Sequence, residues 1–239
     1  MRVETTDRLI VALDVPDAES ARHLVKALGD AVSFYKVGLQ LELAPRGEGL
    51  AFASDLVQTG KSVFLDAKLF DIPETVQRAA ENASRMGVRF LTVHAQGKTV
   101  GAAVRGRGTC ALQILAVTVL TSMDASDVNE LGAADIAVAD LVLARARKAR
   151  EDGADGIVAS GHEVARLRKA LGASCRIVVP GIRRPQDATN DQKRIAAPAE
   201  VARAGADHLV VGRPITHAPD PRRAALEFLE EIAGETASA

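Results

Sequence analysis

Short apolar runs rich in β-branched residues alternate with longer alanine-rich segments of helical period along the whole chain of 239 residues. The runs lack the polar alternation of a half-exposed strand, which is typical of parallel strands covered on both faces. We expect eight strands, at 9–14, 33–38, 62–68, 90–94, 114–118, 156–160, 176–180 and 208–212. Eight strand–helix units predict an α/β fold, a single-domain (β/α)8 TIM barrel over residues 1–239. A doubly wound open sheet is the main alternative.

The balance of charge and the low aromatic content argue against two classes of partner. Lysine plus arginine total 30 and aspartate plus glutamate total 31, so no basic excess is present to hold a nucleic-acid backbone or an anionic membrane. Aromatic residues make up 3% of the chain without tryptophan, which disfavours a base-stacking surface. The longest apolar run, near 112–120, is too short to span a bilayer. We therefore expect no nucleic-acid partner and no membrane partner.

The two cysteines bear on metal binding and on compartment. Cys110 and Cys175 stand far apart and belong to no Cys/His pattern, so neither a zinc site nor a disulfide framework is predicted. We expect two buried free thiols, which suit a reducing compartment. Because no signal peptide is recognisable either, the sequence predicts a cytoplasmic protein.

The stretch 64–75 sets three charged residues into an apolar run that is otherwise typical of a buried strand and its exit loop. Asp66, Lys68 and Asp71 would be costly to bury singly, so their proximity predicts a compensated ionic cluster. On an extended strand, the side chains of Asp66 and Lys68 point to the same side. Asp71 follows in a turn fixed by Pro73, from which it could reach this cluster or a neighbouring subunit. A purely structural ion pair at a strand end is the alternative.

Polar residues also stand near the ends of the other predicted strands, on the face where barrels of this class carry their chemistry. They are Asp14, Lys36, His94, Thr121 and Ser122. The last two strands run into the glycine-containing segments 180–183 and 212–214, which predict a phosphate site. Glycine lets an anion approach the N–H groups of a helix start, and Arg213 can add a bidentate contact. His94 could support the charged cluster or simply pack.

The segment 183–194 after the seventh strand is too long and too polar for an ordinary connection, so we expect a lid. Gln192 offers both donors and acceptors and could bridge a phosphate and a polar base, while Arg183 could close over either. A solvated loop without function is the alternative.

Seven short motifs follow one another from the first predicted strand to the last. They are Val11-Ala12-Leu13-Asp14, Tyr35-Lys36-Val37-Gly38, Asp66-x-Lys68-x-x-Asp71-Ile72-Pro73-x-Thr75, Val117-Thr118-Val119-Leu120-Thr121-Ser122, Pro180-Gly181-Ile182-Arg183, Asp191-Gln192-Lys193-Arg194 and Val211-Gly212-Arg213-Pro214-Ile215. Each motif alone is weak, but their joint order resembles the orotidine 5′-phosphate decarboxylase family over the whole chain.

This resemblance implies the conversion of orotidine 5′-monophosphate (OMP) to uridine 5′-monophosphate (UMP) in pyrimidine synthesis, with no metal and no organic cofactor. Lys68 would stabilise the carbanion at C6 and then protonate it, and the flanking carboxylates favour its ammonium form. Asp66 would lie beside the departing carboxylate, where it strains the substrate or orients Lys68.

The resemblance also implies the remaining site residues and a homodimer. Lys36 and Asp71 would complete an alternating Lys-Asp-Lys-Asp array, with Asp71 and Thr75 contributed by the other subunit. Substrate contacts fall into three groups: Asp14 and Lys36 at the ribose, Thr121 and Gln192 at the pyrimidine edge, and Pro180, Arg183, Gln192, Gly212 and Arg213 at the phosphate corner.

Two other functions remain possible for the same barrel. The Asp-x-Lys-x-x-Asp motif also resembles magnesium-dependent sugar-phosphate decarboxylases and aldolases, which act through an enediolate. A catalytically inactive nucleotide-binding barrel is the second alternative. Dependence on magnesium would distinguish the first, and binding of UMP-like ligands without turnover would distinguish the second.

Overall fold

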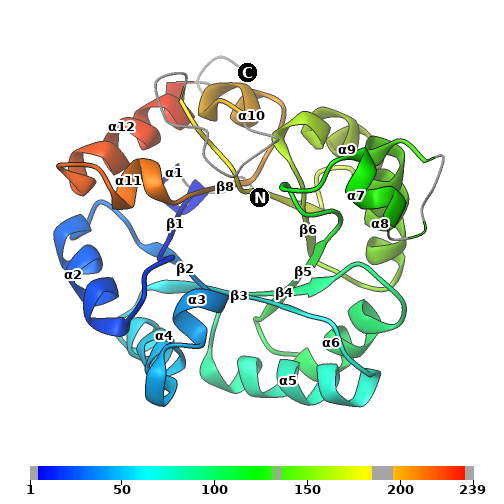
Figure 1. The fold of residues 1–239 in the computed structure, drawn as a ribbon, viewed down its shortest axis with the longest axis horizontal. Helices are drawn as coiled ribbons and strands as arrows, with labels where there is room; N and C mark the ends of the chain where they lie inside the picture. Colours follow the sequence, from blue (N-terminus) through cyan, green and yellow to red (C-terminus); the bar gives the residue numbers. More distant parts are fainter. Residues whose placement is uncertain (1–4, 131, 133–135, 185–195, 235–239) are drawn as a thin grey trace.

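Eight parallel strands close into a barrel in the order of the sequence, which confirms the predicted (β/α)8 fold (Figure 1). The structure, a computed structural model, describes residues 5–130, 132, 136–184 and 196–234. The strands are β1 (Leu9–Ala12), β2 (Phe34–Gly38), β3 (Ser62–Leu69), β4 (Phe90–His94), β5 (Gln113–Val117), β6 (Gly156–Val158), β7 (Arg176–Val179) and β8 (His208–Val211). The strand expected at 9–14 is shorter in the structure and ends at Ala12. Leu13 still donates to the Lys36 carbonyl, whereas Asp14 lines the cavity at the mouth.

An outer ring of helices covers the barrel. Its members are α2 (Ala18–Leu28), α4 (Glu48–Gln58), α5 (Pro73–Met86), α6 (Thr99–Arg107), α8 (Val138–Glu151), α9 (Val164–Leu171), α10 (Pro198–Arg203) and α12 (Pro221–Gly234). The sequence marks both ends of α5, which begins with Pro73 in its first turn and ends at Gly87 in the left-handed conformation. The Asp17 carboxylate likewise caps α2 by accepting from the Ser20 N–H at 2.8 Å.

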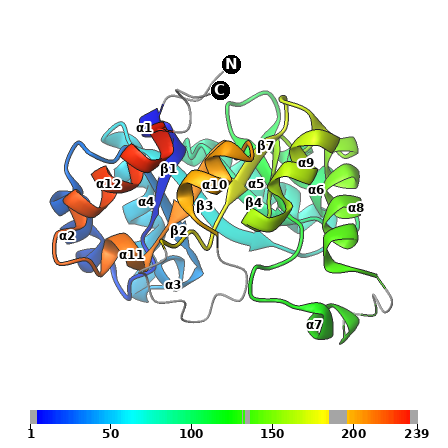
Figure 2. The same ribbon diagram turned by 90° about the horizontal axis from the view of Figure 1, so that it is seen from above.

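Short helices lie at the two ends of the barrel. The helix α1 (Thr5–Arg8) lies at one end, whereas α3 (Leu39–Glu42) and α7 (Ala125–Glu130) lie at the other (Figure 2). The four-residue helix α11 (Arg213–Thr216) follows β8 directly, and two single 3₁₀ turns, Pro45–Gly47 and Gly161–Glu163, complete the described elements. The end that carries α3 and α7 is the one towards which the strands run, so we call it the mouth.

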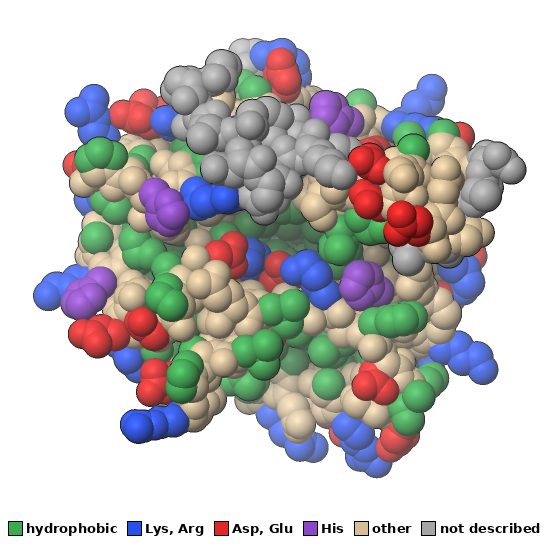
Figure 3. Space-filling view, viewed as in Figure 1, with side chains coloured by type: hydrophobic (Ala, Val, Ile, Leu, Met, Phe, Trp, Pro, Cys, Tyr) green, Lys and Arg blue, Asp and Glu red, His purple; other side chains and the backbone are tan. Residues whose placement is uncertain are grey.

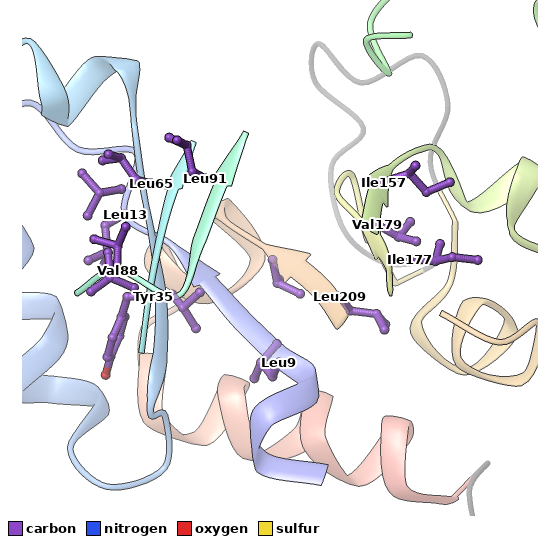
Figure 4. Close-up of a cluster of buried hydrophobic side chains, with 14 of the residues drawn as sticks. Leu9, Leu13, Tyr35, Leu65, Val88, Leu91, Ile157, Ile177, Val179 and Leu209 are labelled. Atoms are coloured by element: carbon purple, nitrogen blue, oxygen red, sulfur yellow. The ribbon is translucent and has the colours of Figure 1, made fainter. Parts of the chain in front are cut away.

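Successive side chains of each strand point to opposite faces of the sheet, and this alternation divides the core into two layers. One set of side chains packs between barrel and helices, and Figure 4 shows Leu9, Tyr35, Leu91 and Ile177 among them. The alternate positions fill the barrel interior with an apolar layer: Ile10, Ala12, Phe34, Phe64, Phe90, Leu115, Val178 and Val210. Two residues further along β2, β3 and β4, the interior positions hold Lys36, Asp66 and Thr92 instead. The apolar layer is therefore the floor of a polar mouth.

The expectation that both thiols are buried is wrong for one of them. Cys175 is buried, but Cys110 is exposed. The reason is local: α6 ends at Arg107, Gly108 takes a positive φ of 59°, and Cys110 falls in the turn that follows. In the part of the chain that the structure describes, no helix combines the length and the apolar character needed to cross a membrane.

Candidate active site

Four charged side chains meet at the barrel mouth in a chain of ion pairs. Lys36 Nζ lies 2.7 Å from Asp14 Oδ1 and 3.5 Å from Asp66 Oδ2. Lys68 Nζ lies 2.8 Å from the same Asp66 oxygen. Figure 3 shows acidic and basic side chains gathered in the hollow at the centre of this face. The structure thus brings together Asp14, Lys36, Asp66 and Lys68, and Asp66 joins the two lysines.

Burial makes the central part of this array electrostatically strong. The side chains of Lys36 and Asp66 are only 10% and 12% exposed, whereas that of Lys68 is 29% exposed and that of Asp14 is 52% exposed. Burial alone lowers the pKa of Lys36, but attraction to Asp66 and Asp14 outweighs it, so the pKa is raised overall. Lys36 is therefore a permanent cation in the inner array, and Lys68 presents the accessible ammonium group.

Gly38 is required at the end of β2 for steric reasons. A Cβ atom built at Gly38 would lie 2.7 Å from Lys36 Nζ and 3.2 Å from Asp14 Oδ1. Contacts this short would push the ammonium group out of its ion pairs. The glycine of the Tyr35-Lys36-Val37-Gly38 motif therefore protects the geometry of the array.

The backbone around Lys68 departs from a regular strand. Leu65 pairs with Leu91, but the next partner of Val93 is Leu69, so residues 66–68 bulge opposite Thr92. Lys68 itself has a φ of 48°, a left-handed conformation that is unusual for a residue with a side chain. The strand β3 runs through Lys68 to Leu69, as expected, and the Lys68 side chain reaches Asp66, but the backbone between them is irregular.

Two connected cavities open beside the array. The first, of about 410 Å³, lies over the ends of β7 and β8 and is lined by Asp14, Lys36, Gln40, Pro180, Gly181, Arg183, Gly212, Arg213, Thr216 and His217, with Ala12 and Val210. The second, of about 360 Å³, lies over β3 and β5 and includes Asp66, Lys68, Thr121 and Ser122. Because both share Asp14, Lys36, Gln40, Pro180 and Val210, they form one site with two chambers. We call them the anion chamber and the array chamber.

The anion chamber has the features of a phosphate site. Gly181 has a φ of 75°, which favours glycine, and it lets the backbone turn towards the chamber. Arg213 begins α11 and lines the chamber beside Gly212. Arg183 is 6% exposed and donates to the carbonyl oxygen of Ile182, so its charge is held at the chamber wall. Two guanidinium groups and close backbone approach suit a dianionic phosphate.

Two of the predicted residues do not line these chambers within one chain. Asp71 and Thr75 are exposed on the exit loop of β3 and the first turn of α5. The Asp71 carboxylate accepts from the neighbouring Ile72 N–H at 2.6 Å. Gln192, with most of the expected lid, lies outside the described residues.

His94 lies beside the array chamber and not in it. It meets the ring of Phe70 edge to face, with centroids 5.8 Å apart, in a neighbouring cavity that Arg145 also lines. Burial, helped by the positive charges of Lys68 and Arg145, lowers the pKa of His94, so the imidazole is neutral at pH 7. The packing role that we considered for His94 fits this environment.

Three residues of the mouth were missed by the sequence reasoning. Gln40 lines both chambers, and a polar residue in the first turn after β2 was the available signal. Thr92 is fully buried and bonds to Asp66 and Lys68, and its signal was a polar residue inside the apolar run of β4. Glu42 follows exposed and buried leucines on α3 and gave no signal of its own.

Glu42 is an unusual carboxyl group behind the array. Its Oε1 atom is buried without a hydrogen-bond partner in the described part of the chain. Burial, followed by repulsion from Asp66, raises the pKa of Glu42 to about 7, and the positive charges of Lys36 and Lys68 oppose that rise only in part. Glu42 therefore binds a proton much more readily near neutral pH than an ordinary glutamate does.

No cluster of three or more His, Cys, Asp or Glu side chains in the described ranges has the spacing of a metal site. Asp14 and Asp66 instead face lysines.

Comparisons with known proteins agree over nearly the full length. Residues 7–228 match the model of the Orotidine 5'-phosphate decarboxylase / HUMPS family. The orotidine 5'-phosphate decarboxylase of Nitrobacter winogradskyi is 53% identical over 227 residues, which cover 95% of this chain and 93% of the relative. That of Methylorubrum extorquens is 52% identical and covers 95% of both chains. The crystal structure of the Lactobacillus acidophilus enzyme has a TM-score of 0.81 at 34% identity, over 94% of this chain and 98% of that one.

The raised pKa of Glu42 predicts a pH-dependent stability. The pKa of Glu42 is higher in the folded chain than the ordinary value of 4.5 that it has when unfolded. The free energy of unfolding therefore falls as the pH rises from about 4.5 to about 7, because the folded chain must then ionise a buried carboxyl. We expect Glu42→Gln to raise Tm at pH 8 by about 2–4 °C, a shift discounted for the partly solvated side chain. At pH 4.5 the difference should nearly vanish. Thermal unfolding of both chains at the two pH values measures it.

The matched control is Glu151→Gln, which removes an exposed carboxylate at the end of α8. Its effect on Tm should be small and alike at both pH values. An equal gain for Glu42→Gln at pH 4.5 and pH 8 would contradict the assignment.

Proposed function

This chain belongs to the Orotidine 5'-phosphate decarboxylase / HUMPS family, and we propose that its reaction is the decarboxylation of OMP to UMP in pyrimidine biosynthesis. The observation that carries this proposal is the buried Lys36–Asp66–Lys68 array at the junction of an anion chamber and a second chamber. A nucleoside monophosphate has matching parts, with its phosphate at one end and its reacting base at the other. A cytoplasmic location belongs to the same proposal.

Lys68 supplies what the reaction chemically needs. When the bond from C6 to the carboxylate breaks, CO2 leaves and the electron pair remains on C6 in the plane of the ring, without an adjacent carbonyl to accept it. An ammonium group held at C6 stabilises that pair and then donates a proton to it, and the resulting amine regains a proton from water. Because the chain's own lysine supplies both charge and proton, we propose that the reaction needs no metal and no organic cofactor.

Asp66 has two effects in this scheme. Its Oδ2 atom accepts from Lys68 Nζ and so fixes the direction of the ammonium group. It also places a negative charge next to the substrate carboxylate, and this repulsion is relieved when CO2 departs. Lys36 balances Asp66 from the other side, and with Asp14 it stands at the junction of the chambers, where we place the ribose hydroxyls.

The remaining contacts follow from the two chambers. We place the phosphate against Arg183, Gly212 and Arg213, with Pro180 and Gly181 shaping the wall. Thr121 in the array chamber is assigned to the pyrimidine edge. Binding energy from the phosphate, remote from C6, holds the base against Lys68, so it contributes to the rate as well as to affinity. Gln192 is proposed to bridge phosphate and base.

We propose a homodimer in which Asp71 and Thr75 complete the site of the partner. Both are exposed and lie away from their own chambers, and the large apolar residues beside Asp71, Phe70 and Ile72, are 62% and 66% exposed. Figure 3 shows apolar side chains gathered beside the hollow of the mouth. Apolar groups of this size around a functional loop support burial against a second copy.

The alternatives are not favoured. The curated relatives with about half of their residues identical carry the name orotidine 5'-phosphate decarboxylase, and no observation points to a sugar phosphate as the substrate. An inactive nucleotide-binding barrel is also disfavoured, because the Asp66–Lys68 pair is in place.

Removal of Lys68 tests the proposed reaction directly. We expect the native chain to consume OMP with EDTA present, and Lys68→Ala to lower kcat by about 10³-fold or more, because one residue supplies both charge and proton. Loss of OMP absorbance measures turnover, and retained UMP binding shows that the variant folds. Lys169→Ala, which removes an exposed lysine from α9, is the control and should leave kcat unchanged. An absence of turnover until magnesium and a sugar phosphate are supplied would overturn the assignment.

A mixture of two inactive variants tests whether the site is shared between subunits. Lys68→Ala and Asp71→Ala chains should each be nearly inactive, but their mixture should recover activity after joint refolding. Half of the random dimers are then hybrids, and each hybrid has one intact site, so we expect about one quarter of the native activity. If Asp71 served its own subunit, both sites of every hybrid would be defective, and the mixture would stay inactive.

A further inference from the structure

Thr92 occupies the centre of the barrel mouth but has no role in the reaction scheme above. It lies in the middle of β4 and is 0% exposed. Its neighbours Leu91 and Val93 face the helices, whereas Phe90 faces the barrel interior. Because side chains alternate along a strand, Thr92 also points inward, above the layer that contains Phe90. A hydroxyl in such a place must find hydrogen-bond partners, because an unpaired buried polar group is costly.

Its two partners are the two residues of the central ion pair. Thr92 Oγ1 lies 2.9 Å from Asp66 Oδ1 and 3.0 Å from the backbone nitrogen of Lys68. The directions are fixed by chemistry: a backbone N–H can only donate, and a carboxylate can only accept. The single hydroxyl proton of Thr92 must therefore point at Asp66, while its lone pair accepts from Lys68. Each bond determines the orientation of the other.

The same hydroxyl sits where the strand ladder fails. Residues 66–68 bulge opposite Thr92, and Lys68 has a φ of 48°. This conformation is unfavourable for a residue with a side chain, and the Lys68 N–H donates to a side chain instead of to a strand carbonyl. The hydroxyl oxygen of Thr92 replaces the missing acceptor. The unusual backbone at Lys68 is thus held by a side chain from the neighbouring strand.

We propose that Thr92 is the positioning residue of the array, fixing the Asp66 carboxylate and the Lys68 backbone through one hydroxyl group. It binds the Asp66 oxygen that the lysines do not share, since both lysines lie nearest to Oδ2. Thr92 thereby holds both ends of the ion pair without touching substrate. The expected loss of kcat rests on the proposed function, whereas the expected change in exchange of the Lys68 amide does not.

The test compares three variants of buried hydroxyls. Thr92→Val removes the hydroxyl at nearly constant volume, and Thr92→Ser restores it. Thr118→Val is the matched control, because the buried Thr118 hydroxyl on the neighbouring side of the barrel donates to the Val158 carbonyl and not to the array. For each we measure kcat with OMP, the Kd of UMP, Tm, and hydrogen exchange of the Lys68 amide.

We expect Thr92→Val to lower kcat by about 10- to 100-fold, because small misplacements of a reacting group have effects of that size. The Kd of UMP should stay within about threefold, since the phosphate contacts remain. Thr92→Ser should recover most of kcat, and Thr118→Val should lower Tm while keeping kcat within about threefold. The Lys68 amide should exchange faster only in Thr92→Val.

Equal kcat in Thr92→Val and native protein would overturn the proposal, as would equal losses in the Val and Ser variants, which would assign the effect to packing. The amide exchange separates this inference from the proposed function. Failure of the native chain to decarboxylate OMP would contradict the proposed function alone. Unchanged protection of the Lys68 amide in Thr92→Val would contradict the positioning role of Thr92.

Discussion

One carboxylate shared between two ammonium groups, Asp66 between Lys36 and Lys68, is the interaction on which the barrel mouth depends. Each of these charges would be costly to bury alone, so the three are stable at this depth only together. The surrounding structure serves that arrangement. Gly38 leaves the space for Lys36, and Thr92 occupies the second oxygen of Asp66. An apolar floor of phenylalanines beneath them excludes water and strengthens every electrostatic contact above.

The alternation of side chains along each strand explains why much of this site could be predicted from sequence. The inward positions of β2 and β3 change from phenylalanine to Lys36 and Asp66 within two residues, and a regular alternation carries them to one face. Alternation also predicted that Lys68 lies on the same side as Asp66, but it could not predict the bulge and the left-handed backbone at Lys68, which no local pattern encodes. Thr92 and Glu42 were missed for a related reason, since a single polar residue in an apolar run or short helix gains its role only from tertiary neighbours. The exposure of Cys110 depended on where α6 ends.

The two chambers divide the work of the site. The anion chamber offers guanidinium groups and backbone from the ends of β7 and β8, and the array chamber offers an ammonium group and a carboxylate from β3. A substrate that fills both is held by its phosphate while its base is exposed to the fixed field of the array. We assign Asp71, on the exposed loop after β3, to the active site of the partner subunit. Catalysis would then require the dimer.

In the proposed mechanism, the ammonium group of Lys68 exchanges a proton with C6 of the nucleotide. The most direct measurement is NMR of UMP incubated with the native chain in D2O containing EDTA, because proton transfer must run in both directions through the same carbanion. We expect the H6 signal of UMP to disappear with native protein and to persist with Lys68→Ala. An H6 signal that persists with native protein, in a preparation that still converts OMP to UMP, would show that another group supplies the proton.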